Sequence, residues 1–275
     1  MSTYTQRLLE AVQFSNARIL ALLPHLTFSS FDEGDVICAK GCSLQSWTCV
    51  ISGFVAASIP LDRGRPLPVH LHGHNDWFGE LSLLSKQPSH YEYTCLTPVE
   101  VIGMGKKHFD TAISDEPNFV RFLARHMAWR AQQQSEMLMV MRLGSSPLRV
   151  FMGLAQFAEA AGSHRNASLA VSKQVVADLP IGQNKIAALC GVSRTLFSEY
   201  IQQLSKAGWL ILRYGGIELQ SVQTWHSFAR MQRERRQTRS RPSVKELLLD
   251  MDSAQAEHGP HRFPNLMGRS IARAE

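Results

Sequence analysis

The sequence lacks the features that would place the protein in or beyond a membrane. No apolar run approaches the ~20 residues needed to span a bilayer, and the first ten residues contain no basic stretch followed by an apolar segment, so no secretory signal is readable. Cysteine is also scarce, and an odd set of five argues against a disulfide framework. We therefore expect a cytoplasmic protein with no membrane partner.

Neither sign of charge dominates strongly. Lysine and arginine number 29 against 23 acidic residues, which gives a formal net charge of +6 and favours a polyanionic partner over an acidic surface role for the protein itself. A chain of 275 residues, 44% of them hydrophobic, is long enough for two domains that each bury a core.

The sequence pattern of segment 28–104 predicts an antiparallel β-roll. Short apolar runs alternate there with glycines, and glycines at this density supply the turns between short strands. The glycines are Gly34, Gly41, Gly53, Gly64, Gly73 and Gly79.

A long helix is predicted from Pro117 to Leu143, because proline suits a first helical turn and no glycine or further proline follows. Apolar residues recur along it at spacings of three or four, with Gln134 as one polar position. A coiled-coil dimer seam and a stripe packed on the protein's own core both fit this pattern. The positions are Val120, Leu123, Met127, Ala131, Gln134, Leu138 and Met141.

The second half begins where Gly144–Pro147 interrupts the helical pattern. A second helix, a polar stretch, a helix-turn-helix and a short hairpin are predicted to follow it. From about residue 226 the chain turns basic and loses clear periodicity, which is typical of a flexible tail. Its clustered arginines are Arg233, Arg235, Arg236, Arg239 and Arg241.

The segment Gln183–Gln202 meets the constraints of a helix-turn-helix. Ala187 is small where two helices cross, Gly191 can adopt the left-handed turn conformation, and Ser193 can cap the second helix. An ordinary capped helical pair is the alternative. The predicted inward face is Leu196, Phe197, Tyr200, Ile201 and Leu204.

The outward face of that second helix carries the candidate DNA-contacting residues, since the N-terminal end of this helix enters the major groove in such motifs. Arg194 can pair with guanine and Glu199 with cytosine, while Lys185 and Arg213 are candidates for phosphate contacts. The full predicted surface is Ser193, Arg194, Thr195, Ser198, Glu199, Gln202, Lys185 and Arg213.

Two further segments carry a family resemblance. Phe31–Ile37 and Val50–Gly53 have glycine-marked turns, and Asp76–Leu84 reads DWFGELSLL, like a phosphate-binding cassette. With the helix-turn-helix, the chain resembles the Crp/Fnr family of transcription regulators. The resemblance implies an α+β fold with four parts: a cyclic-nucleotide-binding-like sensor roll (1–114), a dimerisation helix (115–145), a winged helix-turn-helix domain (146–225) and a flexible tail (226–275).

The resemblance also implies a ligand pocket, in which Glu80 takes the place of the ribose-binding glutamate. The positions that hold the cyclic phosphate, an arginine and a serine or threonine in the family, are His90 and Tyr91 here. A largely neutral histidine does not replace a permanent fork-shaped cation, which argues against cyclic AMP. The predicted pocket is Phe78, Gly79, Glu80, Leu81, His90, Tyr91, Gln134 and Ser135.

Metal and haem sensing form an alternative, because His70, His72 and His74 alternate on a predicted strand and so share one face. With no paired cysteine or carboxylate evident nearby, a solvated strand edge is the favoured interpretation, and we predict no metal site. Cys38, Cys42 and Cys49 lie within the roll and are predicted to be ordinary buried thiols. The other two cysteines are Cys95 and Cys190.

We therefore predict a non-enzymatic, homodimeric regulator that reads an inverted-repeat operator in double-stranded DNA and requires no cofactor. A small-molecule effector other than cyclic AMP and RNA polymerase are the further candidate partners. A regulator without any ligand and the histidine-based sensor are the alternatives. A metal-dependent hydrolase has neither a nucleophile-and-base spacing nor a zinc signature to support it.

Overall fold

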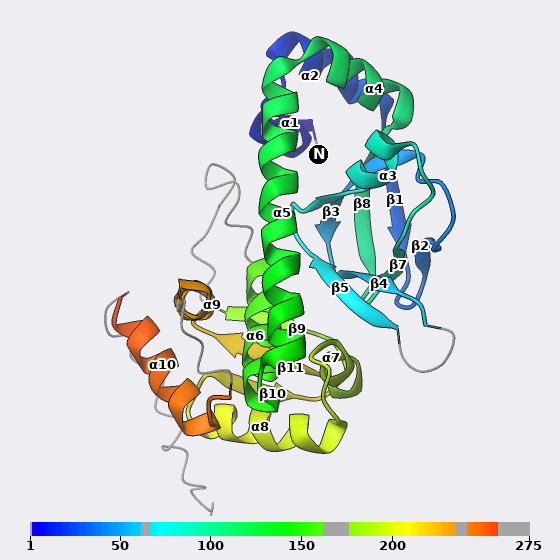
Figure 1. The fold of residues 1–275 in the computed structure, drawn as a ribbon. Coiled ribbons are helices and arrows are strands. Elements are labelled where there is room, and N and C mark those ends of the chain that lie inside the picture. The colour runs from blue at the N-terminus through cyan, green and yellow to red at the C-terminus, as the bar shows by residue number, and fades with distance from the viewer. Residues whose placement is uncertain (1, 62–65, 162–175, 235–240, 258–275) are drawn as a thin grey trace, which may run out of the picture.

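The computed structural model describes residues 2–61, 66–161, 176–234 and 241–257. An N-terminal β-roll lies beside the upper part of one long helix, and a helix-rich C-terminal part surrounds its lower end (Figure 1). The predicted α+β class with an N-terminal antiparallel roll is confirmed.

The roll consists of two antiparallel four-stranded sheets with strand orders β1-β8-β3-β6 and β2-β7-β4-β5. Their inner faces meet in a core that includes Val50, Val55, Phe78, Tyr93 and Val101. The strands are β1 (Leu26–Phe31), β2 (Val36–Cys38), β3 (Ser46–Ser52), β4 (Val55–Ile59), β5 (Leu67–His72), β6 (Trp77–Phe78), β7 (Glu92–Cys95) and β8 (Val99–Gly105).

Short helices cover one side of the roll and form a second core with it. Trp47 stacks on Trp77 with ring centroids 3.9 Å apart, and Phe119 meets Trp47 edge-on at 5.2 Å. The helices are α1 (Ser2–Ala11), α2 (Asn16–Leu22), the 3-10 turn η1 (Leu23–His25), α3 (Glu80–Ser85) and α4 (Lys106–Asp115).

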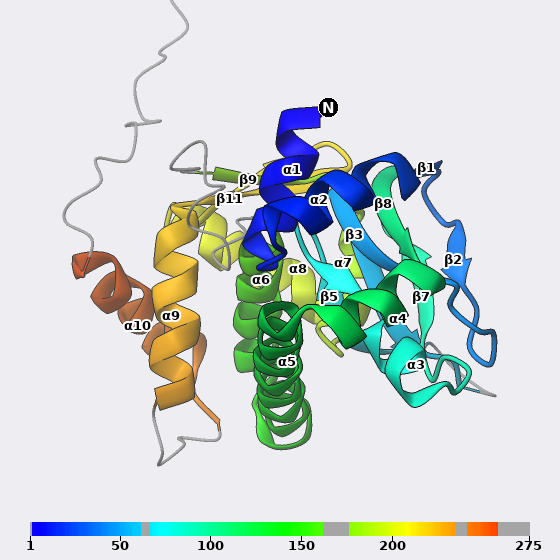
Figure 2. The same ribbon diagram turned by 90° about the horizontal axis from the view of Figure 1, so that it is seen from above.

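Helix α5 (Pro117–Leu143) is continuous, as the sequence predicts. Seen end-on, it separates the roll from the outermost C-terminal helices (Figure 2). One face is buried within the same chain and includes Phe119, Leu123 and Arg130. Leu123 therefore belongs to the protein's own core and not to an exposed seam, whereas Val120 and Leu138 of the predicted seam are exposed.

The C-terminal part forms one continuous core with four roll residues, Phe54, Ala56, Leu71 and Leu96. A three-stranded sheet of order β10-β11-β9 packs there with the helices. The elements are α6 (Ser146–Ala161), β9 (Val176–Leu179), α7 (Gln183–Leu189), α8 (Arg194–Lys206), β10 (Leu210–Arg213), β11 (Gly216–Gln220) and α9 (Val222–Glu234).

The prediction of a flexible tail from residue 226 is wrong for two segments. Helix α9 continues to Glu234, and a further helix, α10 (Val244–Ala256), buries Leu247 and Met251 in the C-terminal core. Arg233 forms ion pairs with Glu159 at 2.7 Å and with Glu136 at 2.9 Å. Segments 235–240 and 258–275, which include three of the clustered arginines, lie outside the described residues.

Within the described part of the chain, no helix is both long and apolar enough to cross a membrane.

Candidate functional sites

Helices α7 and α8 form the predicted helix-turn-helix. The turn places Gly191 at φ +63°, a conformation in which side chains other than glycine are strained. Ser193 then caps α8, because its Oγ accepts a hydrogen bond from Leu196 N at 3.3 Å. Ala187 is buried where a small residue was expected.

Most of the predicted DNA-contacting residues lie on the exposed side of α8. Ser193, Arg194, Thr195, Glu199 and Gln202 are exposed, whereas Ser198 is half-buried. The prediction that Leu196 faces inward is wrong, since 37% of it is exposed. It lies in the first turn of α8, next to the cap.

The remaining predicted phosphate contacts are engaged within the protein. Lys185 on α7 forms an ion pair with Glu33 of the roll, and Arg213 pairs with Glu218 at 2.8 Å across the β10–β11 hairpin. Tyr214 at the tip of that hairpin is fully exposed. The hairpin therefore has the shape of the predicted wing, but both cations would have to exchange partners to meet phosphate.

The cassette lies at the β6–α3 junction. Gly79 adopts φ +105°, and a Cβ there would lie 2.9 Å from the carbonyl oxygen of Ser46, so the position requires glycine. Glu80 follows at the start of α3 and is only 1% exposed. A buried carboxylate needs a paired charge.

Arg130 of α5 supplies that charge. Its Nη1 donates to Glu80 Oε1 at 2.6 Å, and its Nη2 donates to Trp77 O at 2.6 Å and to Asp76 Oδ1 at 3.2 Å. Burial opposes the charged guanidinium, but the Glu80 and Asp76 carboxylates outweigh it and raise the pKa of Arg130. The sequence-based prediction missed Arg130, because the stripe of mostly apolar positions along this helix does not include residue 130.

Comparisons with known proteins identify a matching domain family and a similar regulator. Residues 28–116 match the cyclic nucleotide-binding domain family. The CRP-like cAMP-activated global transcriptional regulator of Mycobacterium tuberculosis is 27% identical over 194 residues, which cover 70% of this chain and 84% of that protein. These similarities support the predicted assignment to the Crp/Fnr family of transcriptional regulators.

Solved structures show the same fold. FixK2 of Bradyrhizobium japonicum superposes with a TM-score of 0.61 at 18% identity, covering 73% of this chain and 96% of that one. The c-di-GMP-responsive global regulator CLP of Xanthomonas campestris gives 0.56 at 17% identity, covering 75% and 99%.

The predicted phosphate-holding positions lie in the loop before β7. His90 is exposed and Tyr91 is half-exposed, with its ring edge-on to Tyr93 at 6.4 Å. Tyr93 in turn stacks on Phe78 at 4.6 Å, so Phe78 belongs to the roll core. An exposed histidine and a half-exposed tyrosine do not form a buried phosphate cradle.

The other predicted pocket residues are spread along α3 and α5. Leu81 and Ser135 are exposed and Gln134 is half-buried. The Ser135 hydroxyl donates to Ala131 O at 2.9 Å, within its own helix. Of the predicted pocket, Glu80 and Gly79 therefore have the geometry that a cassette requires.

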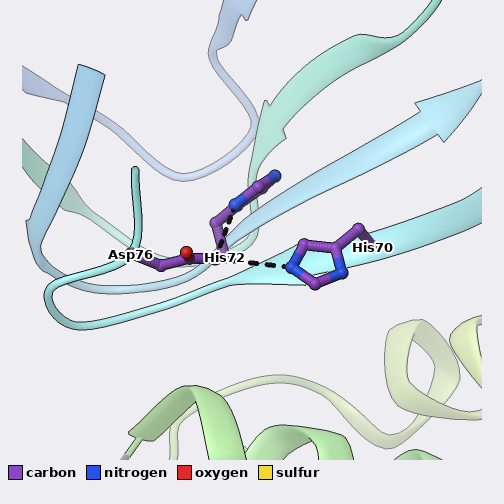
Figure 3. A group of neighbouring side chains, drawn as sticks. All are labelled: His70, His72 and Asp76. Carbon is purple, nitrogen blue, oxygen red and sulfur yellow. Dashed lines mark hydrogen bonds and ion pairs between the residues drawn. The ribbon is translucent and has the colours of Figure 1, made fainter. Parts of the chain in front are cut away.

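The three histidines separate in the structure. His70 and His72 lie on β5 and both approach Asp76 Oδ2, at 3.4 Å from His70 Nε2 and 2.8 Å from His72 Nδ1 (Figure 3). His74 lies beyond the strand, and its Nδ1 contacts Ile51 O at 2.6 Å. The prediction that no carboxylate lies near the histidines is wrong, because the turn after β5 brings Asp76 back to them.

His72 is 1% exposed, and its protonation is suppressed. Burial lowers the pKa of His72 to about 3, although the neighbouring Asp76 opposes the shift. The ring is therefore neutral at physiological pH.

All five cysteines are free thiols, as predicted, but they are not all buried. Cys42 is exposed, in the turn between β2 and β3.

Proposed function

We propose that the protein is a cytoplasmic, homodimeric, non-enzymatic DNA-binding regulator of the Crp/Fnr family that reads an inverted repeat through α8. The single observation that carries the proposal is the exposed polar side of α8, capped by Ser193 and led by Arg194. An arginine at the start of a recognition helix can reach guanine O6 and N7 in the major groove.

The dimer would form along the exposed face of α5. In the single chain this face is exposed to solvent and carries small and apolar side chains. Burial of such a face between two copies drives association. Two copies joined along α5 would present two α8 helices about 34 Å apart, one turn of DNA. The exposed residues are Val120, Ala124, Ala128, Ala131, Leu138 and Met139.

Salt-dependent binding to duplex DNA tests the proposal. The protein should bind a duplex with an affinity that falls steeply as salt rises, because phosphate neutralisation releases counterions. Leu138→Glu should yield a monomer on a sizing column and weaken that binding, whereas Lys107→Glu on α4 should leave the dimer intact. A monomeric wild-type protein that ignores duplexes at low salt would contradict the proposal.

Arg130 favours a second candidate, a regulator that needs no cyclic nucleotide. The Arg130 guanidinium already forms an ion pair with the carboxylate of Glu80. The counterpart of Glu80 binds the ribose in cyclic-nucleotide binders of the family. A nucleotide would have to displace a buried ion pair in order to bind. We therefore favour either an effector other than cyclic AMP or no effector, with RNA polymerase as a further partner to be tested.

A further inference from the structure

A buried cluster of two imidazoles and one carboxylate lies beside the cassette. His70, His72 and Asp76 place one ligand atom each within 4.8 Å of one another. Their side chains are 10%, 2% and 11% exposed, so the cluster is nearly closed to solvent. Figure 3 shows both rings directed at the same carboxylate.

We propose that this cluster is a binding site for a divalent first-row transition metal ion of the zinc or ferrous class. Two imidazole nitrogens and one carboxylate oxygen form a ligand set that such ions prefer, with a further position left for water or a small molecule. His70 and His72 stand two residues apart on β5, and strand geometry directs both rings to one face.

The distance from His70 to Asp76 fits a shared metal ion better than a direct hydrogen bond. His70 Nε2 lies 3.4 Å from Asp76 Oδ2, which is long for a hydrogen bond. Ligand bonds of about 2.1 Å in a tetrahedral arrangement put neighbouring ligand atoms roughly 3.4 Å apart. His72 Nδ1, at 2.8 Å from the same oxygen, needs a small outward shift.

An outer partner for the site is already in place. Arg130 Nη2 holds Asp76 Oδ1, the oxygen that faces away from the two imidazoles. Ligating carboxylates and imidazoles are oriented by such outer hydrogen bonds, which tune metal affinity. The ion would therefore sit one carboxylate away from the guanidinium that holds Glu80 and belongs to α5.

The site does not depend on the proposal of DNA binding. Metal binding here adds positive charge beside Asp76 and weakens the hold of that carboxylate on Arg130. Failure of the protein to bind DNA would not contradict the metal site. Failure to bind a metal would not contradict the proposal of DNA binding.

Calorimetric titration of the metal-stripped, tag-free protein tests the site. Zn²⁺ should bind at one ion per chain, and Co²⁺ should develop the visible absorption of a tetrahedral nitrogen and oxygen site. Mg²⁺ should not bind, because it prefers an all-oxygen octahedral shell. Anaerobic Fe²⁺ in a parallel titration shows which of the two classes binds more tightly.

Variants assign the ligands. His70→Ala removes the less buried of the two imidazoles and should weaken Zn²⁺ binding by at least about ten-fold. Asp76→Asn should weaken it to the same extent without changing the side-chain volume. His74→Ala, which removes the third histidine of the segment, is the matched control and should bind like the parent protein. Circular dichroism establishes that each variant is folded.

Saturable Zn²⁺ binding supports the site if His70→Ala and Asp76→Asn each weaken it by at least about ten-fold and His74→Ala leaves it unchanged. Two results overturn it: no saturable Zn²⁺ binding by the folded parent protein, or binding that survives His70→Ala unchanged.

Discussion

The cassette and the recognition helix use arginine in opposite ways. Arg130 is 5% exposed and donates to two carboxylates and a backbone carbonyl of its own chain. Arg194 is exposed at the start of α8, on the surface that faces away from the core. Removal of the first arginine would leave two buried carboxylates without their cation, whereas we propose that the second acts in binding DNA.

This difference separates stability from recognition within one chain. A buried ion pair is strongly destabilising to break from one side, because the remaining charge stays buried. An exposed arginine has little effect on folding but can determine the choice of a base. We therefore expect that the cassette and α8 can be perturbed separately, and the following variants test that separation.

Arg130→Met should have the largest effect. Glu80 and Asp76 would be left buried without their shared cation, and we expect a loss of about 3–5 kcal/mol in the free energy of unfolding. Urea denaturation followed by circular dichroism measures it. Arg125→Met, at an exposed position of the same helix, should change stability by no more than about 0.5 kcal/mol. Equal effects of the two replacements would show that the buried cluster is not special.

Arg194→Ala should have the next largest effect, and on a different quantity. Specific DNA binding should weaken by about 1–3 kcal/mol if the guanidinium contacts a guanine, while the unfolding free energy stays within about 0.5 kcal/mol of the parent. Fluorescence anisotropy on specific and scrambled duplexes measures both affinities. Lys107→Ala removes the same charge from α4 as a control. Parallel losses on both duplexes would mean that Arg194 contacts phosphate.

Glu33→Gln should act weakly and in the opposite direction. The variant releases Lys185 from its ion pair with the roll, and we expect binding to a scrambled duplex to tighten by less than about five-fold, because exposed pairs contribute about 1 kcal/mol or less. Glu10→Gln on α1 removes an equal negative charge as a control. Weaker binding by Glu33→Gln would show that the pair positions α7 and does not compete with DNA.

Cyclic AMP or cyclic GMP should have no measurable effect on the melting midpoint. A ligand that binds only the folded state raises that midpoint, but Glu80 is held by Arg130 and the family's phosphate-binding arginine is His90 here. Differential scanning fluorimetry with and without nucleotide measures the shift. A clear rise at micromolar nucleotide would overturn the argument from these two residues.

Local rules account for what could be predicted. The roll is marked by glycine-spaced apolar runs, and the helix-turn-helix by residues with one conformational role each, such as Gly191 in the left-handed turn and Ser193 as the cap. Helix α10 was missed although its start carries a readable signal. Ser243 and Glu246 form a capping box, in which each side chain satisfies a backbone amide of the other residue.

Features that depend on long-range pairing could not be found in the same way. Arg130 meets Glu80 across 50 residues of sequence, and a helical period shows which face a residue occupies but not which carboxylate it reaches. Asp76 was passed over because the three histidines were treated as one strand face. The chain instead turns after His72, so His72 contacts Asp76 whereas His74 contacts the backbone of Ile51.

Recovery of the genomic DNA that the protein binds tests the central claim most directly. Fragments selected by the purified protein and sequenced should share an inverted repeat whose half-site centres lie about 10 base pairs apart, and Arg194→Ala should lose the preference for one base in each half-site. Fragments without a common motif, or a motif unchanged by Arg194→Ala and by Glu199→Ala, would contradict reading of DNA through α8.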